Sequence, residues 1–115
     1  MADVLFIFDY RGTLTTLNDI EGYLRNLRAV HPACQISIFT GCSASEIPVG
    51  VQQAVDHLWF KPQSLWSLVA EINPRHLVYV DDEYLSLRAA WRGFHNRGYS
   101  FQVLSPEGLK ELLTE

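Results

Sequence analysis

The chain has few cysteines and no long apolar run. Cys34 and Cys42 are too few for a disulfide framework, so we interpret both as free thiols. No basic, apolar, small-residue leader precedes Val4, so we expect a reduced, cytoplasmic setting. No apolar run approaches the roughly 18 residues that a membrane span needs. We therefore expect no membrane partner.

The chain also lacks an excess of positive charge. Its 9 Lys and Arg residues stand against 13 Asp and Glu residues, which gives a net charge of −4. This balance argues against nucleic acid as a partner. A local basic run is present, and we interpret it as the solvated face of a helix; it comprises Arg88, Arg92, His95 and Arg97. A length of 115 residues predicts a single domain over residues 1–115, with little room for an added lobe.

The most informative stretch is an apolar run that ends on a carboxylate. Five apolar residues over 4–8 are followed by Asp9, and the chain then turns at Gly12. Such a run is typical of a strand buried on both faces, at the centre of a parallel sheet. Asp9 would then lie at the carboxyl edge, where open α/β sheets bind their ligands.

The rest of the chain alternates between strand and helix patterns. Further strands are predicted over residues 35–40, 57–60, 76–82 (ending in the paired carboxylates) and 99–104. Capping pairs predict helices that begin at Asn18 with Glu21 and at Ser43 with Glu46, and prolines predict helices that begin at Lys61-Pro62 and at Ser105-Pro106. Another helix is predicted near Leu87, with an interruption near Gly93. The prediction is an α/β fold, a three-layer α/β/α sandwich with a five-stranded parallel sheet. We expect the first strand at its centre, with the second and third on one side and the fourth and fifth on the other.

Several polar residues follow the predicted strands, so the sheet should bring them to one edge. They are Asp9, Thr40, Lys61, Asp81 and Asp82. A carboxylate can attack phosphorus, while a hydroxyl and the amides opening a helix at Gly41 to Ser43 can hold phosphate oxygens. A lysine can neutralise the charge that develops, and carboxylates are the ligands that Mg²⁺ prefers. Taken singly, each residue also fits an ordinary role as a turn residue, an exposed lysine or a helix cap.

The order of these residues resembles that of the haloacid dehalogenase (HAD) superfamily. The segment Asp9-Tyr-Arg-Gly-Thr-Leu-Thr15 is similar to its first motif, Thr40 to the second, Lys61 to the third and Asp81-Asp82 to the fourth. The resemblance spans nearly the whole chain and implies a Rossmann-like fold with Asp9 as nucleophile. It further implies phosphate binding by Thr40, Gly41 and Lys61. Mg²⁺ would be bound by Asp9, the backbone of Arg11, and Asp81 or Asp82.

Arg11 departs from the family pattern, because HAD phosphatases carry there a second Asp that acts as general acid and base. A guanidinium can do neither at physiological pH. Three interpretations therefore remain: a phosphohydrolase with an unusual general acid, a catalytically silent binding domain, and a receiver-like phosphotransfer domain. Receivers place the acidic pair on the first strand and the lysine on the last, which disfavours the third.

The chain also offers no room for a cap domain after the first or third strand. Capless HAD proteins generally act on macromolecules or close their sites by oligomerising, so the resemblance implies a phosphorylated, macromolecular substrate or a homo-oligomer. We expect Trp66 and Tyr84 to be exposed and to mark such a subunit contact.

Overall fold

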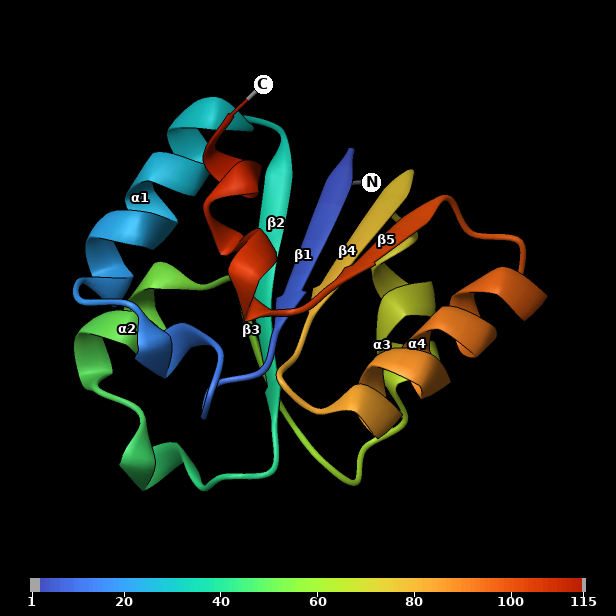
Figure 1. The fold of residues 1–115 in the computed structure, drawn as a ribbon, viewed down its shortest axis with the longest axis horizontal. Coiled ribbons are helices and arrows are strands. Elements are labelled where there is room, and N and C mark those ends of the chain that lie inside the picture. Colours follow the sequence, from blue (N-terminus) through green and yellow to red (C-terminus); the bar gives the residue numbers. More distant parts are fainter. Residues whose placement is uncertain (1–2, 115) are drawn as a thin grey trace.

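The five strands form one parallel sheet in the order β3-β2-β1-β4-β5, which confirms the predicted order (Figure 1). The structure is a computed structural model that describes residues 3–114. The strands are β1 (Val4–Phe8), β2 (Cys34–Thr40), β3 (His57–Phe60), β4 (His76–Val80) and β5 (Phe101–Leu104). The order reverses between β1 and β4, where open α/β sheets hold their ligands.

Helices cover both faces of the sheet. On one side lie α1 (Ile20–Val30), α2 (Val49–Ala54) and the C-terminal 3₁₀ turns η3 (Pro106–Leu109) and η4 (Glu111–Leu113). On the other lie α3 (Leu65–Ile72) and α4 (Tyr84–Asn96), so the fold is the predicted three-layer sandwich. Two further 3₁₀ turns, η1 (Leu14–Thr16) and η2 (Ala44–Glu46), lie in connections. None of the helices within residues 3–114 is long and apolar enough to cross a bilayer.

The β1 strand is buried on both faces because its alternate side chains enter two separate cores. Phe6 and Phe8 pack in the core beneath α1, whereas Leu5 and Ile7 pack in the core beneath α3 and α4. All four are at most 1% exposed. A strand needs a continuous apolar run for this position, since neither face meets water.

The caps of α1 and α3 differ by a few residues from the sequence prediction. Asp19, rather than Asn18, caps α1, and its carboxylate accepts a hydrogen bond of 3.0 Å from the Gly22 amide. The missing side chain of Gly22 allows this approach, since a Cβ there would lie 2.2 Å from a carboxylate oxygen. Ser64 caps α3, so Lys61-Pro62 precedes the helix instead of opening it.

Two predicted helices also begin or end differently. The capping box of Ser43 and Glu46 is present, but it closes the short turn η2, and α2 starts only after Pro48. Pro48 has no amide hydrogen to donate, and its extended ψ of 143° separates the two elements. The last predicted helix consists of two 3₁₀ turns.

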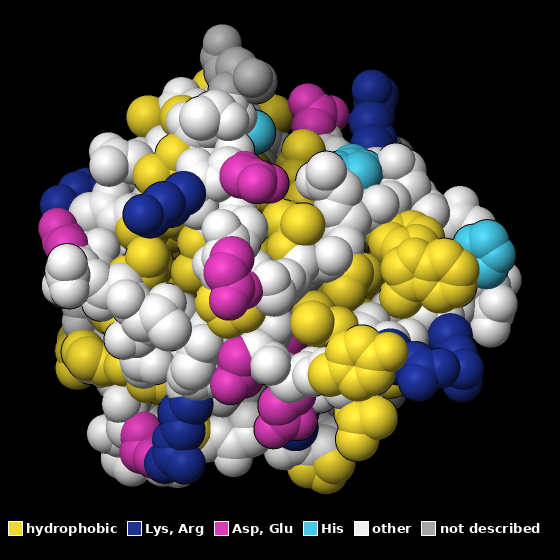
Figure 2. Space-filling view, viewed as in Figure 1, with side chains coloured by type: hydrophobic (Ala, Val, Ile, Leu, Met, Phe, Trp, Pro, Cys, Tyr) yellow, Lys and Arg dark blue, Asp and Glu magenta, His cyan; other side chains and the backbone are white. Residues whose placement is uncertain are grey.

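The α4 helix runs through Gly93 without the predicted interruption. A Cβ at Gly93 would lie 1.9 Å from the Trp66 ring, so the glycine leaves space for that ring. Trp66 is consequently half-buried between α3 and α4, which corrects the expectation that it is exposed. Tyr84 is 68% exposed, as expected, and the outer side of α4 shows apolar side chains beside arginines (Figure 2).

Candidate active site

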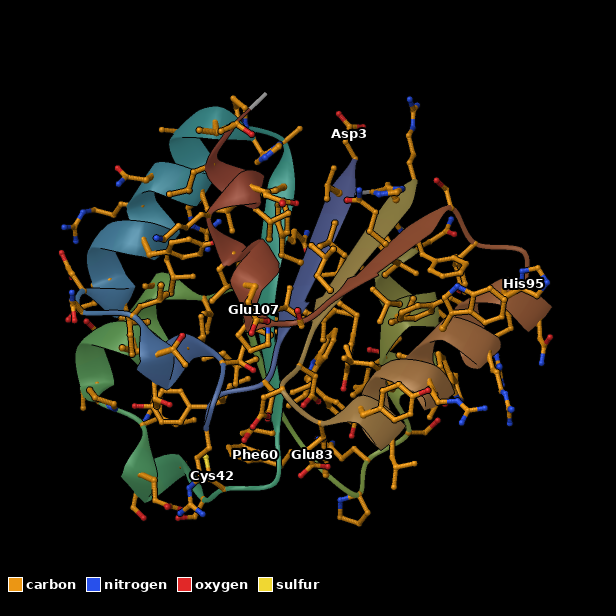
Figure 3. The ribbon with its side chains drawn as sticks, viewed as in Figure 1. Asp3, Cys42, Phe60, Glu83, His95 and Glu107 are labelled. Carbon is orange, nitrogen blue, oxygen red and sulfur yellow. The ribbon has the colours of Figure 1, made fainter. Side chains whose placement is uncertain are left out.

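The carboxyl edge of the sheet gathers the predicted site residues because the strand ends are in register. Phe8 pairs with Val80, so Asp9 and Asp81 follow neighbouring strands at the same level. Thr40 pairs with Phe60, which places Lys61 just beyond it. Figure 3 shows Cys42, Phe60 and Glu83 near this edge and Asp3 at the opposite one.

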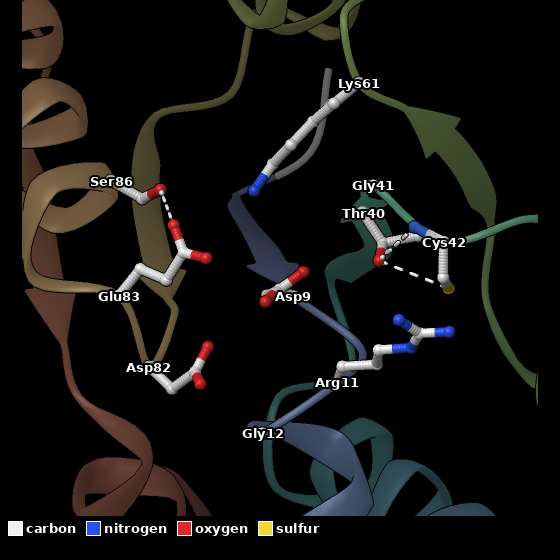
Figure 4. Close-up of a pocket in the computed structure, with 10 residues that line it drawn as sticks. All are labelled: Asp9, Arg11, Gly12, Thr40, Gly41, Cys42, Lys61, Asp82, Glu83 and Ser86. Carbon is white, nitrogen blue, oxygen red and sulfur yellow. Dashed lines mark hydrogen bonds between the residues drawn. The ribbon is translucent and has the colours of Figure 1, made fainter.

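A cavity of about 470 Å³ opens at this edge (Figure 4). Its walls carry seven residues of the predicted set or its motifs, namely Asp9, Arg11, Gly12, Thr40, Gly41, Lys61 and Asp82. The three other wall residues are Cys42, Glu83 and Ser86. Asp81 lies beneath the cavity, fully buried. Within residues 3–114 the connections at this edge hold only loops and short turns, and no lobe covers the cavity.

Three carboxylates converge at the base of the cavity. One oxygen from each of Asp9, Asp81 and Asp82 lies within 4.8 Å of the others. Asp9 is 8% exposed, whereas Asp82 is exposed to the cavity. A cluster of three hard oxygen ligands, one of them open to solvent, suits a Mg²⁺ ion that keeps part of its water shell.

Asp81 is held by a network of donors. The Tyr79 hydroxyl donates to Oδ2 of Asp81 at 2.9 Å, and the Glu83 amide donates to Oδ1 at 2.9 Å. The ammonium of Lys61 lies 3.6 Å from Oδ2. Burial, together with the Asp81 charge, raises the pKa of Tyr79, so this hydroxyl stays protonated and keeps donating. Each carboxylate oxygen has two acceptor positions, so Asp81 retains capacity for a further ligand.

Asp9 titrates closer to neutrality than an ordinary aspartate. Its burial raises the pKa from 3.8 to about 6; the Asp81 charge adds to this effect and the Lys61 charge opposes it. At pH 7 and above most Asp9 side chains are ionised and can act as nucleophiles. A cation bound beside Asp9 would favour the ionised form further.

Thr40 is buried and turned toward the loop that follows it. Its hydroxyl donates to the Cys42 thiol, and it accepts from the Cys42 amide, both at 3.3 Å. Thr40 therefore lies at the predicted place. Its hydroxyl is held in a turn, which is the ordinary role that the sequence also allowed for it. Gly41 lies open beside it, and its backbone faces the cavity without a side chain.

Arg11 points away from the three carboxylates. Its guanidinium pairs with Glu46 of η2, and 69% of its side chain is exposed. In Figure 4 it extends toward Cys42, on the opposite side of the site from Asp82. The side chain therefore leaves the acidic cluster accessible, although it remains part of the cavity wall.

Gly12 brings the first loop against the loop after β4. It adopts a φ of 73°, and a Cβ there would lie 2.2 Å from Oδ2 of Asp82. The backbone conformation therefore favours glycine, and a side chain at this position would also displace the Asp82 carboxylate.

Sequence reasoning missed Glu83 and Ser86 of the cavity wall, and for Cys42 it considered the backbone amide but not the side chain. Cys42 follows the Thr40-Gly41 pair that ends β2. Glu83 and Ser86 are three residues apart at the start of α4, where they face the same side of the helix, and the Ser86 hydroxyl donates to Glu83 at 3.4 Å. The sequence signal for Glu83 and Ser86 was their spacing of three residues directly after Asp82, which puts both on the side of α4 that faces the site.

Comparisons with known proteins add no relative to this picture. No family model matches the chain, and no curated protein or solved structure is detectably similar to it. Inference about function therefore rests on the residues gathered at the carboxyl edge of the sheet.

Proposed function

We propose that this protein is a HAD-like phosphohydrolase with Asp9 as its nucleophile. The observation that carries the proposal is the convergence of a strand-end aspartate, a lysine and an acidic pair at one edge of the sheet, where the cavity opens. Their order along the chain is that of the HAD motifs, and Asp9 lies between Lys61 and Asp82 in the cavity (Figure 4). The fold alone would support many activities, so these side chains carry the argument.

The chemistry follows from the position of Asp9. A carboxylate oxygen of Asp9 forms a bond to phosphorus while the bond between phosphorus and the leaving oxygen breaks, and that oxygen departs with the electron pair. Lys61 lies where it can neutralise charge on the phosphoryl group. Water then attacks the phosphorus of phospho-Asp9, which releases phosphate and restores the carboxylate.

A metal ion fits the donor set of this cavity. Asp9, Asp81 and Asp82, with the backbone carbonyl of Arg11, would hold Mg²⁺, which when bound supplies positive charge to the phosphoryl oxygens. The partly exposed cluster leaves one side accessible to the substrate. Chelation should therefore abolish activity, and the measurement is the rate with Mg²⁺ and with a chelator.

Arg11 restricts the leaving group. Because its guanidinium cannot donate a proton and is paired with Glu46, the leaving oxygen must depart unprotonated. Acyl and aryl phosphates should react, while alkyl phosphates should hardly react. Arg11→Asp should raise the rate on alkyl phosphates by roughly tenfold or more, within the range of general acid catalysis.

The test compares wild type, Arg11→Asp and Asp9→Asn on acetyl, phenyl and alkyl phosphates. Arg25→Asp provides a matched control, because Arg25 is exposed on α1 outside the cavity. Activity of a folded Asp9→Asn variant would show that Asp9 is not the nucleophile. Equal wild-type rates on alkyl and phenyl phosphates would show that another residue supplies the proton.

The second candidate is a binding domain that has kept the HAD-like fold. It is favoured by the way both cations at the cavity are already paired, Lys61 with Asp81 and Arg11 with Glu46 of η2. A crystal soaked with Mg²⁺ and a phosphate analogue separates the candidates. Metal between Asp9 and Asp81 or Asp82 supports the phosphohydrolase, whereas inactivity without metal binding supports the binding domain.

A further inference from the structure

A second, largely apolar hollow adjoins the proposed catalytic cavity. It lies between α3 and α4 and has a volume of about 270 Å³. We call it the α3–α4 groove, and its apolar walls come from Phe39, Leu65, Trp66, Tyr79, Ala89 and Ala90. An enclosed apolar cavity of about 150 Å³ is enough to bind benzene, so the groove has room for one or two aromatic rings.

The groove is continuous with the catalytic cavity. Lys61 and Ser86 belong to the walls of both. The Lys61 ammonium lies 5.6 Å from the centre of the Phe39 ring and 3.6 Å from Asp81, so it stands where the apolar and charged regions meet. A ligand with its phosphoryl group at Asp9 can therefore extend past Lys61 into the groove.

The far wall of the groove is fixed in place before any ligand binds. The Trp66 ring packs edge-on against Phe94, with the ring centroids 5.2 Å apart. The Arg97 guanidinium lies 4.4 Å from the same ring, and Gly93 leaves the space the ring occupies. A wall that is already ordered costs less entropy when a rigid group packs on it.

We propose that the substrate is a phosphate monoester of an aromatic alcohol, with its ring in the α3–α4 groove. This inference rests on the proposed function and deepens it. Two separate features point to the same class: the groove offers apolar and aromatic walls, and Arg11 stands where HAD phosphatases carry their proton donor. A phenolic oxygen has a pKa of about 10, as in tyrosine, and so departs as a phenolate far more readily than an alkoxide does.

The step balances without any further reactant. The bond between Asp9 and phosphorus forms as the bond between phosphorus and the aryl oxygen breaks. The phenolate leaves with the electron pair and takes its proton from water. Water then hydrolyses phospho-Asp9.

The first experiment compares 2-naphthyl, phenyl and acetyl phosphate as substrates. Phenol and 2-naphthol are of similar acidity, so a difference between their esters reports contact with the second ring. We expect kcat/KM for 2-naphthyl phosphate to exceed that for phenyl phosphate by roughly tenfold, because the second ring buries additional apolar surface. Equal values for the two esters would overturn the inference.

Ala89→Phe tests the groove directly. Ala89 lies on the exposed side of the groove, so a phenylalanine there should fill the groove without entering the core. We expect the ratio of kcat/KM for 2-naphthyl phosphate to that for acetyl phosphate to fall roughly tenfold. Ala70→Phe, at an exposed position of α3 outside the groove, is the matched control and should keep the wild-type ratio. An unchanged ratio in Ala89→Phe would overturn the inference.

Binding separates failure of this inference from failure of the proposed function. Asp9→Asn should bind 2-naphthyl phosphate and shift the NMR signal of the Trp66 indole N–H, and adding Ala89→Phe should suppress that shift. If acetyl phosphate is hydrolysed but the Trp66 signal does not move, the groove inference fails alone. If nothing is hydrolysed yet the signal moves, the proposed function fails and the aromatic site stands.

The source of the aromatic phosphate is a further arm of the same test. Phenyl phosphate and a peptide that carries phosphotyrosine are compared as substrates, because both present the same aryl ester. Faster turnover of the peptide would identify a protein-borne ester, and equal turnover a small molecule. Rejection of both, with acetyl phosphate still hydrolysed, would overturn the inference.

Discussion

Replacing Asp9 with asparagine should stabilise the metal-free protein at neutral pH. The folded state raises the pKa of Asp9 from 3.8 to about 6, so the folded protein binds the proton more tightly than the unfolded chain does. The stability of the wild type should therefore fall as the pH rises from about 4 to about 6. One pKa unit corresponds to about 1.4 kcal/mol, which sets a ceiling of about 3 kcal/mol. Solvent in the open cavity screens the charge, so we expect roughly 1–2 kcal/mol.

The assay is urea unfolding of wild type and Asp9→Asn in chelator, at pH 4 and at pH 7.5. The free energy of unfolding of Asp9→Asn minus that of wild type is taken at each pH. Subtracting its value at pH 4 from its value at pH 7.5 isolates the effect of the Asp9 charge, because effects of the substitution that do not depend on pH cancel. Asp3→Asn is the control, since Asp3 lies at the opposite edge of the sheet with 61% of its side chain exposed. If the Asp9→Asn difference is the same at both pH values, burial does not penalise the Asp9 charge as argued.

Further predictions concern the residues that shape the site. Gly93→Ala should lower the free energy of unfolding by about 1–2 kcal/mol, because displacing Trp66 outweighs the gain in helix propensity. Gly50→Ala is the control, since its Cβ meets only the end of a surface glutamate side chain. In the same denaturant unfolding assay it should be neutral or stabilising. Tyr79→Phe should lower the free energy of unfolding by about 1.5–3 kcal/mol, since the buried Asp81 carboxylate loses a donor. Denaturant unfolding measures this change. An unchanged unfolding midpoint would mean that Asp81 does not depend on the Tyr79 hydroxyl.

The sheet could be predicted from the sequence because each strand carries its own local signal. The run before Asp9 is apolar at every position, as a strand between two cores requires, and the alternation with helices then fixes a parallel sheet. Helix starts were less predictable because neighbouring residues can serve equally well as caps. Asn18 and Asp19 are both good capping residues, and in the structure it is Asp19 that accepts from the Gly22 amide, where the missing side chain leaves room for its carboxylate.

The position of a site residue could be predicted where it directly follows a strand, but its direction could not be predicted where tertiary contacts decide it. The positions of Asp9 and Lys61 follow from strand register alone. The direction of Arg11 does not, because it depends on an ion pair with Glu46, which is 35 residues further along the chain. The placement of Trp66 likewise depends on a gap at Gly93 that no periodicity reveals. The homo-oligomer and the macromolecular substrate stay predictions.

The contact between Gly12 and Asp82 limits how the sequence can vary. Because a side chain at position 12 would displace the Asp82 carboxylate, a change at position 12 also alters the position of Asp82. If Asp82 binds a metal, selection for that ligand also fixes the glycine, although the glycine has no chemistry of its own. Among homologues, we expect residues other than glycine at position 12 to occur together with a shorter side chain at position 82, and such pairs should mark lineages that have lost the metal site.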